Sequence, residues 1–262
     1  MLINDSIDAI GITRNTLLPS GGSDMQFTFI YGWNDVHRND NTEYNNNRLY
    51  GLFFSTDRPS TTINADLVYV HDRDGDRDGI FWGISDVRRI GHYNLSSRIL
   101  GSHATDEESS AVGDGYLLFA ELSWTPPWTN DNVYINAFWG IDQFTSAARA
   151  PSAGGPLGRT GILFAAIGLG NYGAPINNTA QDAYGIAVGY QQFITPLKNQ
   201  FIYELGLKQD DRDNGDDLSI AAAIRYRHVL TQRTIIQLDA FASHNDSRAN
   251  GNGLRVEFRT NF

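Results

Sequence analysis

The sequence predicts an all-β protein, a transmembrane antiparallel up-and-down β-barrel, and three observations lead to this fold class. Apolar and polar residues alternate with period two along most of the chain, which is the pattern of strands rather than helices. Most alternating segments are about 9–13 residues long, the length that a tilted strand needs to cross a bilayer. Strands of soluble proteins are usually shorter. The connections also alternate between short and long.

The alternation predicts twelve strands. The last strand is the clearest, because Leu254, Val256 and Phe258 share one face while Arg255 and Glu257 share the other. The expected strands are 25–33, 48–56, 61–71, 79–90, 93–102, 115–125, 132–142, 183–194, 200–209, 217–229, 233–244 and 253–262.

The lengths of the connections favour a barrel over a soluble sandwich. The connections after the even-numbered strands are short, namely 57–60, 91–92, 126–131, 195–199 and 230–232. Those after the odd-numbered strands are mostly longer and polar, namely 34–47, 72–78, 103–114, 143–182, 210–216 and 245–252. Turns on one side of a membrane and loops on the other produce this order, whereas a Greek-key sandwich has no reason to keep it.

The longest connection, 143–182, contains an apolar segment that bears on the strand count. Residues 161–170 are uniformly apolar rather than alternating, and counting them as a strand would put the next turns on the wrong side. We therefore expect one long loop that folds into the lumen and constricts it, since loops of this size are uncommon unless functional. Its candidate constriction residues are Arg149, Arg159, Leu163 and Phe164. A fourteen-stranded barrel with an extra strand pair is the alternative.

The end of the chain resembles a known class of protein. Residues 255–262 form an alternating strand closed by Phe262, which is similar to the C-terminal signature of Gram-negative outer-membrane β-barrels. The resemblance covers residues 25–262 and implies contact with outer-membrane lipid and lipopolysaccharide, and recognition of Phe262 by the barrel-assembly machinery. Residues 60–125 have a weaker similarity to alginate-export-type barrels, whose ligand residues find no match here.

The N-terminal residues 1–24 are interpreted as a separate segment, either a plug or a linker, that precedes the barrel at 25–262. The first residues lack the basic stretch and the long apolar core of a signal peptide. No run of about eighteen apolar residues is found, so a transmembrane helix is not expected.

Composition excludes several classes of function. The formal net charge is −10, and phosphate contacts with nucleic acid need clustered Lys and Arg, so nucleic-acid binding is disfavoured. The chain has no cysteine, which rules out disulfides and zinc–thiolate sites. The mean hydropathy of −0.35 suits barrel strands, which mix lipid-facing and lumen-facing residues.

Charged residues gather on one face of the expected strands, and we interpret that face as the lining of a pore. Such charges are hydrated or paired inside a barrel but are costly on the lipid face. The candidate lining residues are Asp66, Glu121, Glu204, Arg225, Arg227, Asp239, Arg255, Glu257 and Arg259. The alternative is a set of ion pairs that merely fills a small barrel.

Asp74, Asp76 and Asp78 match the first half of a calcium-binding loop. The glutamate that should follow six residues after Gly79 is replaced by Ser85, and EF-hands also need flanking helices. Calcium is therefore a weak candidate, and no cofactor is expected.

Three functions are compatible with this fold. The first is an outer-membrane channel for passive diffusion of small hydrophilic solutes. The second is a structural or assembly barrel that anchors a protein partner, and a homo-oligomer is compatible with either. The third, a hydrolase, has only two local candidate groups, namely His103 with Ser102 and Asp106, and His244 with Ser243 and Asp246. Because neighbours on a strand face opposite ways, no catalytic pair is expected and the chain is not predicted to be an enzyme.

Overall fold

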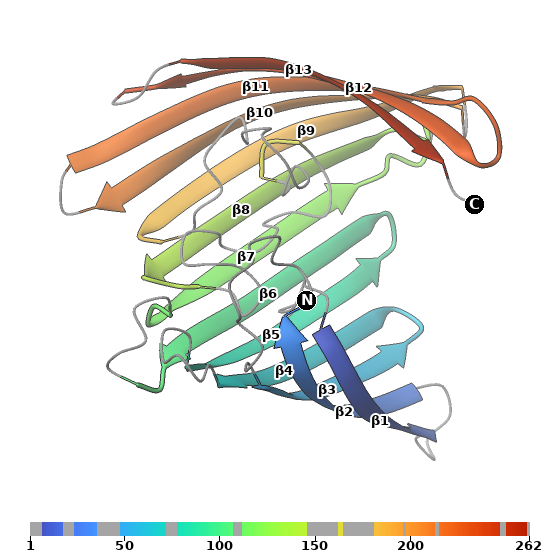
Figure 1. Cartoon of the computed structure of the whole chain (residues 1–262). Helices are drawn as coiled ribbons and strands as arrows, with labels where there is room; N and C mark the ends of the chain where they lie inside the picture. Colours follow the sequence, from blue (N-terminus) through green and yellow to red (C-terminus); the bar gives the residue numbers. More distant parts are fainter. Residues whose placement is uncertain are drawn as a thin grey trace.

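The computed structural model describes residues 7–17, 24–35, 48–71, 78–106, 112–145, 162–164, 181–195, 198–212, 215–246 and 250–260. These residues form one antiparallel sheet in which each strand pairs with its neighbour in sequence. The strands are β1 (Ile7–Leu17), β2 (Asp24–Asp35), β3 (Arg48–Arg58), β4 (Thr61–His71), β5 (Gly79–Ile90), β6 (Tyr93–Ala104), β7 (Gly115–Trp124), β8 (Asn132–Asp142), β9 (Ala183–Thr195), β10 (Asn199–Arg212), β11 (Gly215–Val229), β12 (Thr234–Asn245) and β13 (Gly251–Thr260). The sheet curls strongly from β1 to β13 (Figure 1).

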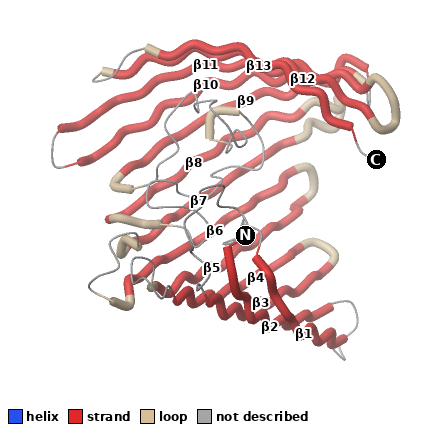
Figure 2. Tube along the Cα trace, viewed as in Figure 1, coloured by secondary structure: helices blue, strands red, loops and turns tan. Residues whose placement is uncertain are grey.

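Every described element is a strand, turn or loop (Figure 2). No helix in the described part of the chain is long and apolar enough to span a membrane.

The structure contains all twelve predicted strands as β2 to β13, but the count of twelve is wrong. The additional strand is β1, which lies within the segment 1–24 that we expected to be a plug or linker and pairs along its length with β2. Its alternation is hidden in the sequence because Arg14 falls on its apolar face and the register shifts between Ile7 and Asp8. The sheet therefore has 13 strands over the described residues.

The fourteen-stranded alternative is wrong as well. Within 161–170, the described residues Ile162–Phe164 form bends rather than a strand, and the remainder lies outside the described residues.

The loop predicted at 210–216 is shorter in the structure than expected. β10 and β11 extend until only residues 213–214 separate them, and Asp210 pairs with Asp217 at the far end of this hairpin.

The two faces of the sheet differ as the alternation predicts. On β10, Glu204 is buried while its neighbour Leu205 is 67% exposed. The register carries this division across the sheet, since Leu205 lies opposite Val188 on β9 and Ala222 on β11. We call the face with Glu204 the inner face and the face with Leu205 the outer face. The outer face carries most of the exposed large apolar side chains.

Aromatic side chains line both ends of the outer face. Near the end with long loops, the ring centroids of Tyr50 and Tyr69 lie 6.1 Å apart in a stacked arrangement. Near the end with short turns, Tyr93 stacks on Trp124 and Tyr190 stacks on Tyr203. Two such belts with an apolar band between them are typical of barrels whose strands cross a bilayer.

The core lies against the inner face. Its larger cluster is centred on β7 to β11 and includes Tyr134, Phe138, Phe144 and Ile162–Phe164. A smaller cluster contains Leu49, Val68, Val70, Phe81 and Val112. Phe144 and residues Ile162–Phe164 of the long loop are therefore packed as core rather than exposed to solvent.

The sheet has two edge strands. Each strand from β2 to β12 pairs on both sides, whereas β1 and β13 each pair on one side within the described residues. Because the strands are antiparallel and thirteen in number, β1 and β13 run in the same direction. Closure of the sheet into a barrel is not seen among these residues.

The turn between β7 and β8 is fixed by Asp131. Its carboxylate accepts hydrogen bonds from the Tyr190 hydroxyl at 2.5 Å and from the Phe193 backbone N–H at 2.9 Å. These two donors on β9, the Tyr190 hydroxyl first, lower the pKa of the Asp131 carboxyl below its ordinary value. The ionised carboxylate therefore ties this turn to the neighbouring strand.

Replacing Asp131 with asparagine should lower the free energy of unfolding modestly, by less than about 1 kcal/mol, because the group is only partly buried and its hydrogen bonds are weakened rather than removed. A carboxyl whose pKa is lowered by folding stabilises the fold above its unfolded pKa and loses that effect as the pH falls through the folded pKa. The difference between D131N and the parent should therefore be largest near neutral pH and vanish well below about pH 4. Urea unfolding in detergent between pH 3 and 8 measures it, and an equal difference at every pH would contradict it.

Candidate functional site

A charge network occupies the inner face of β11 and β12. The Arg225 guanidinium donates to both oxygens of Asp239, with distances of 2.7 Å from Nε and 3.0 Å from an Nη. The Gln237 amide donates to Asp239 at 3.0 Å and accepts from an Nη of Arg227, also at 3.0 Å. Asp239 is only 2% exposed, so its charge depends on these donors. The antiparallel register makes this network possible, because it places Arg225 opposite Asp239 and Arg227 opposite Gln237.

A second group of charges continues the network onto β13. Arg255 lies opposite Asp239 and Glu257 lies opposite Gln237. The Glu257 carboxylate contacts Arg255 at 2.7 Å and Arg259 at 2.5 Å. The side chains of this group are more exposed than the Arg225–Asp239 pair, since β13 is an edge strand.

The remaining predicted lining residues share the inner face but lie apart from this network. Glu121 is buried on β7, opposite Asn136 of β8. Asp66 is half-buried on β4, opposite Phe53 of β3. The structure thus brings together the charged lining residues on β11 to β13, whereas Asp66 and Glu121 lie on β4 and β7, strands that do not pair with them.

Residues Ile162–Phe164 of the long loop are buried against the inner face. The exposed fraction is at most 1% for each of them. The Phe164 ring meets the Phe138 ring edge-on, with centroids 5.1 Å apart. The Glu204 carboxylate accepts the backbone N–H groups of Ile162 and Leu163, the latter at 2.8 Å. The two other candidate constriction residues, Arg149 and Arg159, lie outside the described residues.

The two ends of this loop meet at its base. The Asp182 N–H donates to the Asp142 carbonyl at 3.1 Å. Both residues have left-handed backbone angles, with φ of 55° at Asp142 and 43° at Asp182, and aspartate is one of the few non-glycine residues that adopt this region. The loop therefore leaves and rejoins the sheet at one point.

Sequence reasoning missed the burial of Tyr134 and the partner of Lys208, a charge that parity placed on the inner face. Tyr134 of β8 is fully buried on the inner face, and Lys208 forms a buried ion pair with Asp210 at 2.7 Å. From Ala183 to Gly189, the inner face of β9 carries only small residues, namely Ala183, Gly185, Ala187 and Gly189. That repeat of small residues is visible in the sequence, and it was the available signal that something packs closely on β9.

The weak calcium candidate gains no support within the described residues. Asp74 and Asp76 lie outside them, and the Asp78 carboxylate contacts Nδ1 of His71 at 3.0 Å. No group of three potential metal ligands occurs in the part of the chain that the structure describes.

The two local histidine–serine candidates do not form pairs. Ser102 donates to the Gly113 carbonyl at 2.5 Å, while His103 contacts Asp114 on the other side of the strand. Ser243 lies 3.3 Å from the Gly251 carbonyl, and His244 contacts Asn250. The absence of enzymatic activity stays a prediction.

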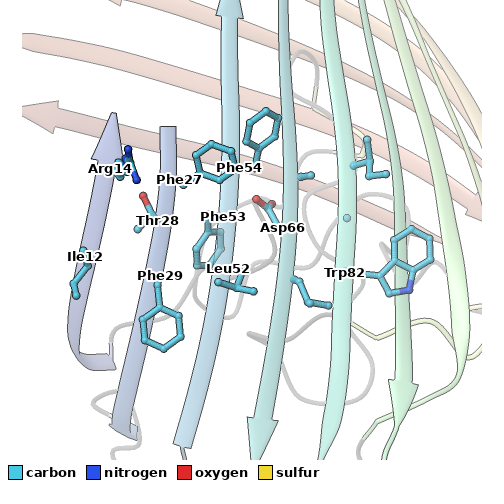
Figure 3. Close-up of a pocket in the computed structure, with 14 residues that line it drawn as sticks. Ile12, Arg14, Phe27, Thr28, Phe29, Leu52, Phe53, Phe54, Asp66 and Trp82 are labelled. Atoms are coloured by element: carbon cyan, nitrogen blue, oxygen red, sulfur yellow. The ribbon is translucent and has the colours of Figure 1, made fainter. Parts of the chain in front are cut away.

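The outer face has an apolar hollow of about 690 Å³ over β1 to β5. Its walls include Phe27, Phe29 and Leu52, with Trp82 at one side and Arg14 at the β1 edge (Figure 3). This hollow lies on the face opposite to the charge network and the loop. It is part of the apolar outer surface rather than of the candidate pore.

Comparison of the fold with solved structures finds similar outer-membrane proteins. OpdK of Pseudomonas aeruginosa, solved with vanillate, gives a TM-score of 0.65 at 12% identity, with 95% of this chain and 68% of that chain covered. OccK10 (OpdN) of the same organism gives 0.67 at 10% identity, with 97% and 72% covered. Wzi of Escherichia coli, a carbohydrate-binding barrel involved in capsule assembly, gives 0.53 at 11% identity, with 87% and 53% covered.

Sequence comparisons add no assignment, because no family model matches the chain and the search of curated proteins gives no match. The described sheet is similar in fold to these outer-membrane porins of Gram-negative bacteria, and the all-β antiparallel arrangement agrees with the one that the alternating strands predicted.

Proposed function

We propose that this protein is an outer-membrane channel that admits small hydrophilic solutes by passive diffusion. The observation that carries the proposal is the arrangement of the inner face. An apolar loop segment is fixed against one part of the wall, while a network of charged and amide groups covers the part next to it. Such a wall narrows a pore and leaves a polar path beside the constriction. The porin-like fold and the apolar outer face support a location in the outer membrane.

The charge network supports a preference for hydrophilic solutes. Within the network, the four guanidinium groups of Arg225, Arg227, Arg255 and Arg259 outnumber the two carboxylates of Asp239 and Glu257. Solutes that pass this wall exchange water for hydrogen bonds with fixed donors, which apolar solutes cannot do. OpdK, a neighbour in fold, was solved with vanillate, so small organic molecules are the first probes to try.

Planar-bilayer recording tests the channel directly. We expect the purified parent protein to give discrete conductance steps, and the variant lacking residues 150–176 to give larger ones. If neither protein conducts although both insert into the bilayer, the channel proposal fails.

A substitution on the outer face tests whether that face contacts lipid. Leu205→Arg places a charge in the middle of β10, where a lipid-facing arginine costs about 2–4 kcal/mol near the bilayer midplane. Trp128→Arg, in the exposed β7–β8 turn, is the matched control and should cost far less. Unfolding by urea from phospholipid vesicles gives both values. Equal effects of the two variants would contradict a lipid-facing band at Leu205.

The fold is also compatible with a structural or assembly barrel that anchors a partner. The likeness to Wzi, whose function concerns capsule assembly, favours this second candidate. It predicts a folded protein without conductance that retains a partner or carbohydrate, so the same bilayer recording separates the two functions.

The proposal also requires that both sheet edges be paired, because backbone groups left unpaired in hydrocarbon are costly. The edges of β1 and β13 therefore need partners, either each other, another segment or a second copy. Contact with lipopolysaccharide and recognition by the barrel-assembly machinery remain predictions, and Phe262 itself lies outside the described residues.

A further inference from the structure

We propose that Glu204 positions the constriction, acting as a carboxylate latch that holds residues 162–164 of the long loop in a socket on the inner wall. This inference rests on the proposed channel function. It assigns to Glu204 a role different from that of a lining charge, because its carboxylate is directed at the loop backbone rather than at the solute.

The first line of evidence is the hydrogen bonding of Glu204. One oxygen, Oε2, accepts the consecutive backbone N–H groups of Ile162 and Leu163. Without this acceptor, both N–H groups would be left buried and unsatisfied, which is costly. Glu204 is itself only 2% exposed, so two backbone donors and a buried acceptor satisfy one another. The loop backbone is thus bound at one defined point of the wall.

The second line of evidence is the shape of the wall beside Glu204. A Cβ atom added to Gly206 would lie 2.8 Å from Cδ1 of Leu163, and one added to Gly185 would lie 3.0 Å from Cζ of Phe164. A larger residue at Gly206 would therefore meet Leu163 of the loop first, whereas one at Gly185 would meet Phe138 and the Leu207 carbonyl of the wall as well as Phe164. Ala187, opposite Gly206 on β9, continues the same small surface.

The apolar contacts close the socket on its other side. The Phe164 ring packs against Phe138 of β8, and Phe144 is buried in the same cluster. The segment is therefore held by one polar contact, with Glu204, and by apolar packing against the wall. Together these contacts would keep the width of the constriction constant. A loop held by apolar contacts alone could slide along the wall, whereas Glu204 fixes its register.

Thiol accessibility tests the latch without depending on conductance. The chain has no cysteine, so Leu163→Cys introduces a single buried thiol. Adding Glu204→Ala should speed the reaction of this thiol with a water-soluble methanethiosulfonate by about tenfold or more, since two hydrogen bonds to the loop backbone are lost. Glu204→Gln, which keeps a weaker acceptor, should give an intermediate rate.

Two further variants make the test specific. Gly206→Val keeps Glu204 but fills the socket, and should also raise the reaction rate of the L163C thiol. Glu257→Gln removes a carboxylate that contacts arginines rather than the loop, and should leave that rate unchanged.

A thiol at an exposed turn checks that the fold is intact. Trp128→Cys places it in the β7–β8 turn, where the parent side chain is 77% exposed. This thiol should react at the same rate with and without Glu204→Ala, because neither state of the loop covers it.

The outcomes separate the latch from the channel. An unchanged rate for the L163C thiol in a folded E204A protein overturns the latch, whatever the conductance. A faster rate with no conductance in any variant supports the latch and overturns the proposed channel. A faster rate together with a larger conductance supports both.

Discussion

Replacing Asp239 with alanine should lower the free energy of unfolding by about 3–5 kcal/mol, because the Arg225 guanidinium would remain buried without its bidentate carboxylate. The side chain of Arg225 is 12% exposed and that of Asp239 is 2% exposed, so water replaces little of the lost interaction. The Gln237 amide would lose its acceptor at the same time. Urea unfolding in detergent micelles measures the change.

Two controls show whether the effect comes from the buried pair. Glu257→Ala, on the more exposed edge strand, should cost no more than about 1 kcal/mol, as surface ion pairs do. The double substitution Arg225→Met with Asp239→Leu should recover most of the stability, since an apolar pair of similar volume often replaces a buried ion pair without loss. If D239A costs no more than E257A, the Arg225–Asp239 pair is not a structural element of the wall.

Deleting residues 150–176 should raise the single-channel conductance several-fold, on the order of three- to tenfold, because the deletion removes the segment that narrows the lumen. The loop ends are already joined by the hydrogen bond between Asp142 and Asp182, so the shortened loop can close without pulling β8 and β9 apart. The conductance of the deleted and parent proteins in the same planar bilayer measures the effect.

The same deletion should also reduce stability, because Ile162, Leu163 and Phe164 leave their places in the core. Full burial of each such side chain is worth about 1.5–3 kcal/mol. A deletion variant that folds with unchanged conductance would show that the loop segment does not obstruct the path of ions.

Much of the fold was predictable because the two faces of each strand have different surroundings, so apolar and polar residues alternate along its sequence. The last strand shows this, with Leu254, Val256 and Phe258 outward and Arg255 and Glu257 inward, as the alternation predicts. β1 was not predicted, because Arg14 lies on its apolar face and its register shifts at Ile7, so the alternation with period two is lost locally. The short connection between β10 and β11 was not predicted either. The acidic residues suggested a longer loop, although Asp210 and Asp217 pair with each other as parts of the two strands.

The candidate site was predictable in its residue types and faces but not in its contacts. Parity placed Arg225, Arg227, Asp239 and Glu204 on one face. It could not show which of them pair, because strand register depends on turn geometry and on the packing of both strands. The apolar character of Leu163 and Phe164 predicted that they fold inward. It did not predict that Glu204 accepts the hydrogen bonds of the loop backbone.

By itself, the sequence determined twelve of the strands, the two faces of the sheet and the side of each connection between those strands, because these follow from local periodicity and from the length and polarity of each segment. Only the tertiary structure decided that the sheet has a thirteenth strand, that Asp239 receives both ends of the Arg225 guanidinium, and that Glu204 binds the loop rather than standing free. These contacts join residues far apart in the chain, and their distances depend on register and packing that no local pattern encodes.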